Sequence, residues 1–242
     1  MKYLIIDNRM RLVEKNKLKE LGYNLIEINR NDNVYEEISS HVDIFTCKIG
    51  ECLIIEPSLK ITLPSECNTI LGKEYVNSKY PDDIKYNFCK IGKKAIHNFQ
   101  HTDAVIKEEL IKKGYELINT AQGYTNCSIA VIDENTAIVT DKGLYKILEK
   151  HNIDVLYIDY EPDIKLLTSK WFSNRNGFIG GAISRVGDNV VVFGDLNKID
   201  CNGTIRNFII SKNLKIIDFK ELDVIDYGGI VERWKKLKWI LD

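Results

Sequence analysis

Two copies of one tetrapeptide, Cys47-Lys-Ile-Gly50 and Cys89-Lys-Ile-Gly92, set the frame in which the whole chain can be read. Each copy lies inside a longer stretch of alternating apolar residues, and these stretches begin at His41 and Asp83. A pattern that recurs at intervals of tens of residues is typical of repeat architectures. Related stretches begin at Tyr124 and Phe178, with a shorter fragment at Asp226.

Each full copy predicts a β-hairpin, because stretches rich in Val, Ile and Phe flank a turn such as Gly187-Asp-Asn189. Between the hairpins, residues 10–21, 103–113 and 144–150 carry apolar residues three and four apart and predict helices, each followed by a strand. Thr102 or Asp103 is the expected N-cap of the second helix. Gly22 and Gly114 are placed where a left-handed residue ends a helix.

The five copies predict a closed object of five ββαβ units. Residues 2–7 read as a strand that completes the unit whose hairpin begins near Asp226, so the two ends of the chain would meet and close the ring. No linker rich in Pro, Gly or Ser divides the chain, and we therefore expect residues 1–242 to form one domain.

Composition narrows the class of function. The hydrophobic content of 44% supports a sizeable core, while a formal net charge of −1 favours neither nucleic acid nor an anionic membrane as a partner. The N-terminus reads as a short strand rather than a signal peptide, and no apolar run reaches transmembrane length. We expect a cytoplasmic protein, and nothing in the sequence predicts its oligomeric state.

The chain has six cysteines and no Cys-x-x-Cys pair. In a reducing compartment a disulfide framework is not expected. Cys47 and Cys89 hold equivalent positions in two repeats and read as small core residues. The spacing of His97 and His101 lacks the glutamate of the helical zinc motif, so no metal is predicted.

Cys127 stands apart because a loop containing Gly123 leads directly into its strand. In a radial repeat such strand entrances converge on the central axis, where one site can draw on several units. Alternation along a strand that includes His41 and Asp43 would put both side chains on one face. Together the three residues could supply a nucleophile, a general acid/base and a charged binding group. In a gapless alignment, however, Cys127 matches Ile44, which has the wrong parity to share that face.

At these residues the chain resembles the guanidine-modifying, or pentein, superfamily. His41-Val-Asp-Ile-Phe45 is similar to its His-x-Asp-x-Phe signature, and the segment from Gln122 to Ser128 is similar to the one that presents its catalytic cysteine. The resemblance implies a five-bladed α/β propeller and a bacterial branch related to deiminases, dimethylarginine dimethylaminohydrolase and amidinotransferases. The chain departs from the superfamily's pattern at Ile179-Gly-Gly-Ala182, because members of the superfamily normally carry substrate-binding acids at this strand entrance.

The resemblance further implies a hydrolase or amidinotransferase for a small guanidino or amidine compound, with no cofactor. Cys127 would form a covalent thiouronium intermediate, His41 would move protons, and Asp43 would hold the guanidinium. Candidate substrate-binding residues are Asp7, Asp226, Tyr124, Asn126, Gly180 and Gly181.

Simpler interpretations stay open for the same residues. Cys127 could be a core thiol like Cys47, His41 and Asp43 could be structural, and the glycine pair at 180 and 181 could serve close packing at a crowded axis. The resemblance also leaves an alternative function, that of a non-catalytic binding protein, either a ligand sensor or a translation factor or other factor with a protein partner, as some members of the superfamily are.

Overall fold

The computed structural model describes residues 2–65 and 67–234 and has a mixed α/β fold built from six small, open sheets of three strands. The sheet orders are β18-β1-β2, β3-β4-β5, β6-β7-β8, β9-β10-β11, β14-β15-β16 and β13-β12-β17. In the first five sheets the first strand pairs antiparallel with the second, which pairs parallel with the third. The five sheets correspond to the five copies read from the sequence, and the five-bladed ring remains a prediction.

The strands are short, and their bounds are β1 Lys2–Asp7, β2 Asn24–Ile28, β3 Thr46–Ile49, β4 Cys52–Ile55, β5 Thr69–Leu71, β6 Cys89–Ile91, β7 Lys94–His97, β8 Glu116–Asn119, β9 Ile129–Asp133, β10 Thr136–Val139, β11 Asp154–Tyr157, β12 Ile164–Leu167, β13 Phe172–Asn176, β14 Ile183–Val186, β15 Asn189–Val192, β16 Lys215–Ile217, β17 Val224–Ile225 and β18 Val231–Trp234. The α-helices are α1 Leu12–Glu20, α2 Val42–Phe45, α3 Ala104–Lys112, α4 Thr125–Ser128, α5 Lys142–Lys150, α6 Ile179–Ala182 and α7 Thr204–Ser211. Three 3-10 turns are η1 Glu36–Ile38, η2 Leu196–Lys198 and η3 Cys201–Gly203.

The two ends of the described chain pair as the sequence predicted. β18 is antiparallel to β1, with Lys2 opposite Trp234 and Ile5 opposite Val231, and β1 is parallel to β2. One sheet therefore combines the first and last strands. β18 also lies against β3 of the next unit, just as β9 lies against β6 and β14.

The predicted helices are present, and their ends follow from local chemistry. The side chain of Asp103 accepts a hydrogen bond from the Val105 amide at the start of α3. Gly22 and Gly114 follow α1 and α3 with φ of +88° and +67°, a conformation that costs glycine least. The unit that contains β4 and β5 has no helix between these strands, and α7 and the sheet of β12, β13 and β17 were not predicted.

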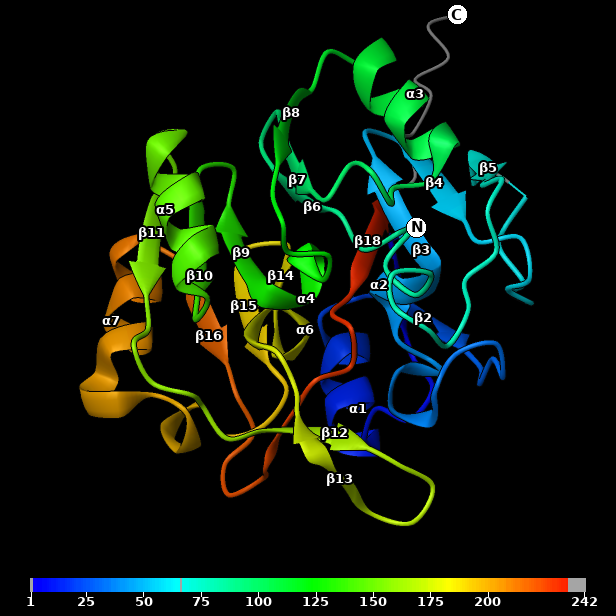
Figure 1. The fold of residues 1–242 in the computed structure, drawn as a ribbon. Helices are drawn as coiled ribbons and strands as arrows, with labels where there is room; N and C mark the ends of the chain where they lie inside the picture. Colours follow the sequence, from blue (N-terminus) through cyan, green and yellow to red (C-terminus); the bar gives the residue numbers. More distant parts are fainter. Residues whose placement is uncertain (1, 66, 235–242) are drawn as a thin grey trace, which may run out of the picture.

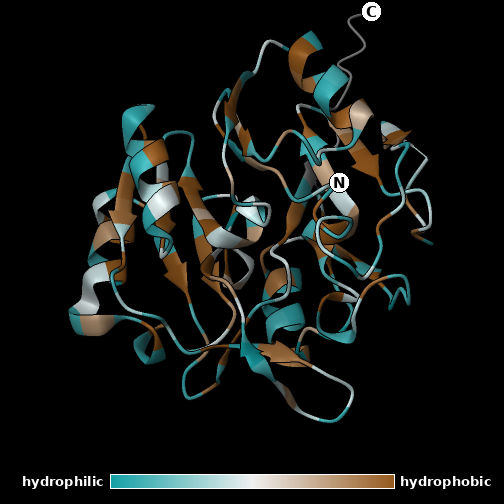
Figure 2. Cartoon of the chain, viewed as in Figure 1, coloured by the Kyte–Doolittle hydropathy of each residue, from teal (hydrophilic) through white to brown (hydrophobic). Residues whose placement is uncertain are grey.

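The longer helices and the one-turn helices occupy different places. In Figure 1, α3, α5 and α7 lie at the periphery, whereas α4 and α6 lie near the middle and pack against each other. Figure 2 shows that the hydrophobic residues concentrate on the strands. Cys47 and Cys89 are buried in this core, as predicted. The middle of the molecule is therefore where short turns from several units meet.

Candidate active site

Three one-turn helices, α2, α4 and α6, each lead directly into the first strand of a unit. The prediction that His41 and Asp43 lie on a strand is therefore wrong: His41 is the N-cap of α2, and Asp43 lies within its single turn. The Thr46 hydroxyl donates to the Val42 carbonyl at 2.8 Å and closes this turn. The parity objection no longer applies to Cys127, because a helical turn does not alternate its side chains between two faces.

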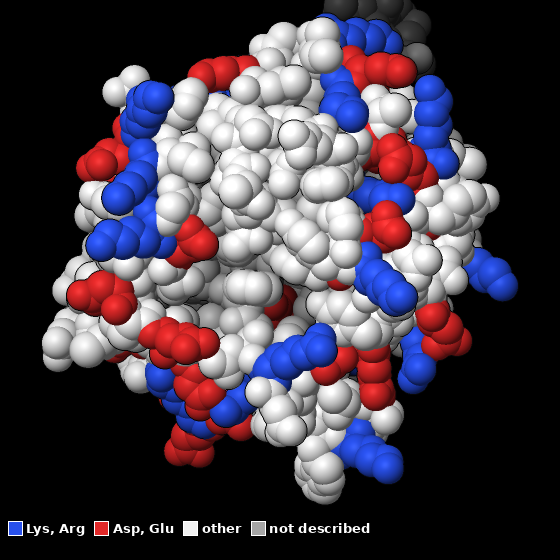
Figure 3. All heavy atoms as spheres, in the orientation of Figure 1, with Lys and Arg blue, Asp and Glu red and all other residues white. Residues whose placement is uncertain are grey.

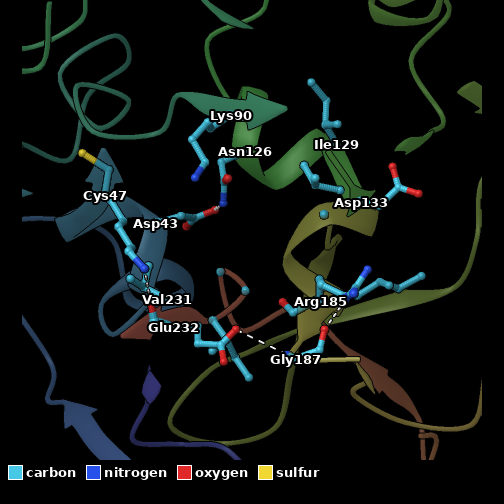
Figure 4. A pocket seen from close by; sticks show the side chains of 18 of the residues that line it. Asp43, Cys47, Lys90, Asn126, Ile129, Asp133, Arg185, Gly187, Val231 and Glu232 are labelled. Atoms are coloured by element: carbon cyan, nitrogen blue, oxygen red, sulfur yellow. Dashed lines mark hydrogen bonds between the residues drawn. The ribbon is translucent and has the colours of Figure 1, made fainter. Parts of the chain in front are cut away.

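The Cys127 thiol lies between two polar side chains from other units. It donates a hydrogen bond to Asp43 Oδ2, with 2.9 Å between sulfur and oxygen, and it accepts one from Asn87 Nδ2 at 3.1 Å. Asn87 Oδ1 also accepts from the backbone amides of Asn126 and Cys127. The Asn126 side chain donates to Asp43 Oδ2 at 3.2 Å, an interaction visible in Figure 4. Three units thus converge on the sulfur.

His41 and Asp226 lie next to this group. His41 Nδ1 is 3.8 Å from Asp226 Oδ1, and both residues are about 1% exposed. The Asp226 carboxylate accepts hydrogen bonds from the amides of Phe178 and Gly228, each at 2.8 Å. Gly228 has a φ of +68°, and a Cβ there would lie 2.6 Å from both Asp43 Oδ1 and His41 Cβ. Only glycine lets the chain pass so close to both side chains.

The electrostatics of the site are set by burial. Burial raises the pKa of Asp43 to about 6, and burial together with the charge of Asp43 raises the pKa of Asp226 to about 7. The pKa of the Cys127 thiol is raised well above its ordinary value by burial and by the two carboxylates. The pKa of His41 is lowered, mainly by burial and then by the charge of Arg9.

The two carboxylates therefore stand beside a neutral thiol and a neutral imidazole. Within the described part of the chain, no Lys or Arg forms an ion pair with Asp43 or Asp226. Buried charges are normally paired or bound to a ligand. Asp43 Oδ1 and both ring nitrogens of His41 lack a hydrogen-bond partner among the described residues, so the site has unused capacity for a polar, cationic ligand.

This arrangement predicts an unusual dependence of stability on pH. Asp43 and Asp226 have pKa values of about 6 and about 7 in the folded protein, against an ordinary 3.8. Between about pH 4 and pH 7 these two carboxyl groups bind more protons in the folded chain than in the unfolded chain, so their contribution to the free energy of unfolding falls as the pH rises. The lowered pKa values of the buried His41 and His97 contribute in the opposite direction. Denaturant titrations across this range, compared between the parent and Asp226→Asn, should therefore show a decline due to Asp226 on the order of a few kcal/mol.

Matched variants separate this effect from the rest of the chain. Asp226→Asn should flatten the decline, whereas Asp32→Asn, at an 81% exposed side chain, should leave it in place. If the free energy of unfolding of Asp226→Asn changed with pH by the same amount as that of the parent, the assignment would be contradicted.

Of the other predicted site residues, Asp7 and Tyr124 have partners away from Cys127. Both oxygens of the buried Asp7 accept hydrogen bonds from Arg9, at 2.7 and 3.0 Å from its side-chain nitrogens. The Tyr124 hydroxyl donates to Asp83 Oδ2 and lies 3.4 Å from the Tyr35 hydroxyl. We find these two residues around the site rather than at the sulfur.

Gly180 and Gly181 lie where the chain comes closest to the site. A Cβ on Gly181 would lie 1.8 Å from Asp226 Oδ1, and a Cβ on Gly180 would lie 2.2 Å from the Asn126 carbonyl. The pair therefore allows close packing, in agreement with the simpler interpretation, although a role in ligand binding remains a prediction.

Sequence reasoning missed Asn87 and Asp83. In the repeat frame Asn87 stands where the first copy has Phe45, and Asp83 stands where it has His41. A polar residue in place of a buried phenylalanine was a signal available from the sequence. Arg9 was also missed, and its role depends on contacts with distant segments that no local pattern reveals.

No group of three or more His, Cys, Asp and Glu side chains among the described residues could hold a metal ion. Helices in the same part of the chain are all too short or too polar to cross a membrane. On the face drawn in Figure 3, basic and acidic side chains are interspersed around the margin.

Comparison with known proteins shows a family. Residues 5–231 match the model described as "Family of unknown function (DUF6873)". The chain belongs to this family. No curated protein matches it.

Solved structures show the fold. DDAH from Pseudomonas aeruginosa, as a mutant complexed with citrulline, is 11% identical with a TM-score of 0.54, over 91% of each chain. Agmatine deiminase from C. jejuni, as a mutant with substrate bound, is 10% identical with a TM-score of 0.53, over 98% of this chain and 94% of that one. A dimethylarginine dimethylaminohydrolase adduct with S-methyl-L-thiocitrulline is 11% identical with a TM-score of 0.53, over 91% of this chain and 92% of that one. This DUF6873 member therefore has the pentein superfamily fold, and the low identities extend the likeness no further.

Proposed function

We propose that the protein is a cysteine-dependent hydrolase or amidinotransferase that acts on the guanidinium or amidine group of a small, arginine-like compound. One observation carries the proposal: the Cys127 sulfur lies 2.9 Å from Asp43 in a buried site whose carboxylates form no ion pair with a Lys or Arg of the described chain. A guanidinium is planar and cationic, and it can donate several hydrogen bonds to carboxylates. The site thus provides a nucleophile beside a carboxylate whose charge is opposite to that of the guanidinium.

A cationic ligand would change the state of the nucleophile. The thiol donates a hydrogen bond to Asp43, and the nearby negative charges oppose formation of the thiolate by raising the pKa of the thiol. A guanidinium at Asp43 and Asp226 would offset these charges and so lower the pKa of Cys127. The thiol would ionise readily only when the ligand is present, which protects it from other electrophiles.

The chemical steps follow from the groups at hand. The guanidinium takes the place of the thiol as the hydrogen-bond donor to Asp43, Cys127 gives its proton to His41, and the sulfur attacks the central carbon of the guanidinium. The protonated His41 then donates to the departing nitrogen, which leaves a thiouronium on the sulfur. Neutral His41 next accepts a proton from water, or from an acceptor amine, as that group attacks the same carbon; the carbon–sulfur bond breaks, and His41 returns this proton to the sulfur to regenerate the thiol.

The same proposal includes the arrangement of the sheets, the branch of the superfamily and the cellular location. We place the five equivalent sheets as the blades of one ring in a single domain, with α2, α4 and α6 at its centre. Within the superfamily we place the chain in a bacterial branch related to the deiminases and amidinotransferases, acting in the cytoplasm without a cofactor.

A second function, that of a non-catalytic binding protein, is supported by a different observation. Cys127 is 3% exposed and its pKa is raised, which is typical of an unreactive thiol. Such a site suits a binding protein that senses a cationic ligand without transforming it. The two functions differ in whether the sulfur reacts with an electrophile that carries an amidine.

Selective alkylation tests the proposal. We expect 2-chloroacetamidine, which is cationic, to label Cys127 faster than iodoacetamide, which is neutral, with the exposed Cys201 as an internal reference in the same mass spectrum. The preference should disappear in Asp43→Asn, because the group that holds the cation is lost. His41→Ala should slow labelling by the amidine.

The variants also sort the alternatives. In Asp43→Asn the neutral reagent should react faster than in the parent, because a charge that opposes the thiolate is gone. Labelling of Cys127 that is no faster with the amidine than with the neutral reagent would exclude the enzyme. Retained binding of guanidinium ligands in that case would favour the sensor.

A further inference from the structure

A pocket of about 750 Å³ adjoins the site from the side of the inner strands. Asp43, which accepts hydrogen bonds from the Cys127 thiol and the Asn126 side chain, lines this pocket. Asn126, Gly180 and Gly228 line it as well. Figure 4 shows Asp43, Asn126, Lys90 and Arg185 around this space, contributed by different units. Its volume is within the range of pockets that hold small ligands.

Basic side chains recur at one position of the repeat and line this pocket. Lys48 and Lys90 are the second residues of the two Cys-Lys-Ile-Gly copies, and Arg185 holds the same place before Gly187. Side chains at equivalent positions of equivalent strands point the same way. The repeat therefore directs three cations into one cavity.

The three cationic side chains differ in their hydrogen-bond partners. The Lys48 ammonium donates to the Glu232 carbonyl at 2.9 Å, and the Arg185 guanidinium donates to the Ile132 carbonyl at 2.9 Å. The Lys90 backbone pairs with β7, but its ammonium makes no hydrogen bond or ion pair with any residue in the described ranges. Its ammonium is thus the group in the pocket with the most capacity for a ligand.

Acidic residues line the pocket as well, but they are engaged or exposed. The Glu232 carboxylate accepts hydrogen bonds from the Tyr23 hydroxyl at 2.6 Å and the Gly187 amide at 3.3 Å. The Asp188 side chain is 98% exposed. Asp133 accepts from the Asn135 amide. In contrast, Asp43 presents an oxygen with no partner in the described chain.

We propose that Lys90 binds an anionic group of the ligand whose cationic head lies at Asp43. This inference rests on the proposed function, because it takes the guanidinium head from there. Asp43 and Lys90 line the same pocket from neighbouring units, so one ligand in this pocket would meet both side chains. Lys90 is then a residue that determines specificity.

Binding of two matched compounds tests the inference. We compare 4-guanidinobutanoate with 4-guanidinobutanamide, which has the same length and head but no negative charge, by titration calorimetry. The parent should bind the carboxylate about tenfold more tightly, as expected for a charge-assisted hydrogen bond. Lys90→Met should bind the two compounds equally, while Lys146→Met, at an exposed position on α5, should keep the preference.

The outcomes distinguish this inference from the proposed function. Equal affinity of the parent for both compounds, or a preference that survives in Lys90→Met, would overturn the role of Lys90 and leave the guanidinium site intact. Failure of both compounds to bind the parent would overturn the guanidinium site and the inference that depends on it.

Discussion

Replacing Arg9 with Met should lower the free energy of unfolding by about 3–5 kcal/mol, the cost of leaving a buried charge without its partner. Arg9 bonds to both oxygens of Asp7, whose side chain is fully buried. The same guanidinium donates to the carbonyls of Glu36, Glu37 and Leu167, at 3.1, 2.9 and 3.3 Å. It therefore joins the end of β1 to η1 and to β12, and equilibrium unfolding in denaturant should register the loss.

Two further variants identify the cause of this loss. Arg30→Met removes an ion pair with Asp32 in which both side chains are more than half exposed, and it should cost about 0–1 kcal/mol. Adding Asp7→Asn to Arg9→Met should restore part of the stability, because the buried charge is then gone. If Arg30→Met proved as costly as Arg9→Met, burial of Asp7 would not be the reason.

Arg9 also connects stability with the site. Its charge helps to lower the pKa of His41, after the larger effect of burial. In Arg9→Met the pKa of His41 should therefore rise, which a titration followed by NMR can measure. A pKa that stays constant or falls would show that Arg9 does not act on the imidazole.

Gly180→Ala should lower the free energy of unfolding by about 3 kcal/mol, at the upper end of the usual cost of overpacking. The new Cβ would lie 2.2, 2.6 and 2.7 Å from the carbonyl oxygens of Asn126, Cys127 and Ile129. These are backbone atoms, so the clash cannot be relieved by turning a side chain. The variant must move α4, which carries Cys127, and we expect slower labelling of this cysteine together with the lower stability.

Gly143→Ala is the matched control for this change. Gly143 lies in the first turn of α5, and the nearest atom to its new Cβ is Asp141 Oδ1 at 3.0 Å. Because Ala is a better helix former than Gly, the expected change in stability stays within about 1 kcal/mol. Similar losses for the two variants would mean that close packing at the centre is not what requires Gly180.

Which features of this protein can be predicted from its sequence depends on how far apart in the chain the interacting residues lie. Hairpins, caps and the pairing of the two chain ends follow from alternation, turn residues and the repeat, which act over a few neighbouring residues. The residues of the site were recognised by resemblance; Asp43 lies at the Cys127 sulfur, Asp7 and Tyr124 do not, and the roles of all of them remain predictions. Asn87 could have been found from the repeat frame, because it replaces Phe45 of the first copy.

The sequence by itself determined that the chain repeats, that each repeat is a hairpin followed by a further strand, and that the first and last strands share a sheet. These features depend on periodicity and on local hydrogen bonding. Only the tertiary structure decided that His41 and Asp43 precede their strand in a helical turn, that the Cys127 thiol bonds to Asp43, and that Arg9 bonds to both oxygens of Asp7. Burial, distance and charge pairing between units far apart in the chain set these contacts, and no pattern within one repeat contains that information.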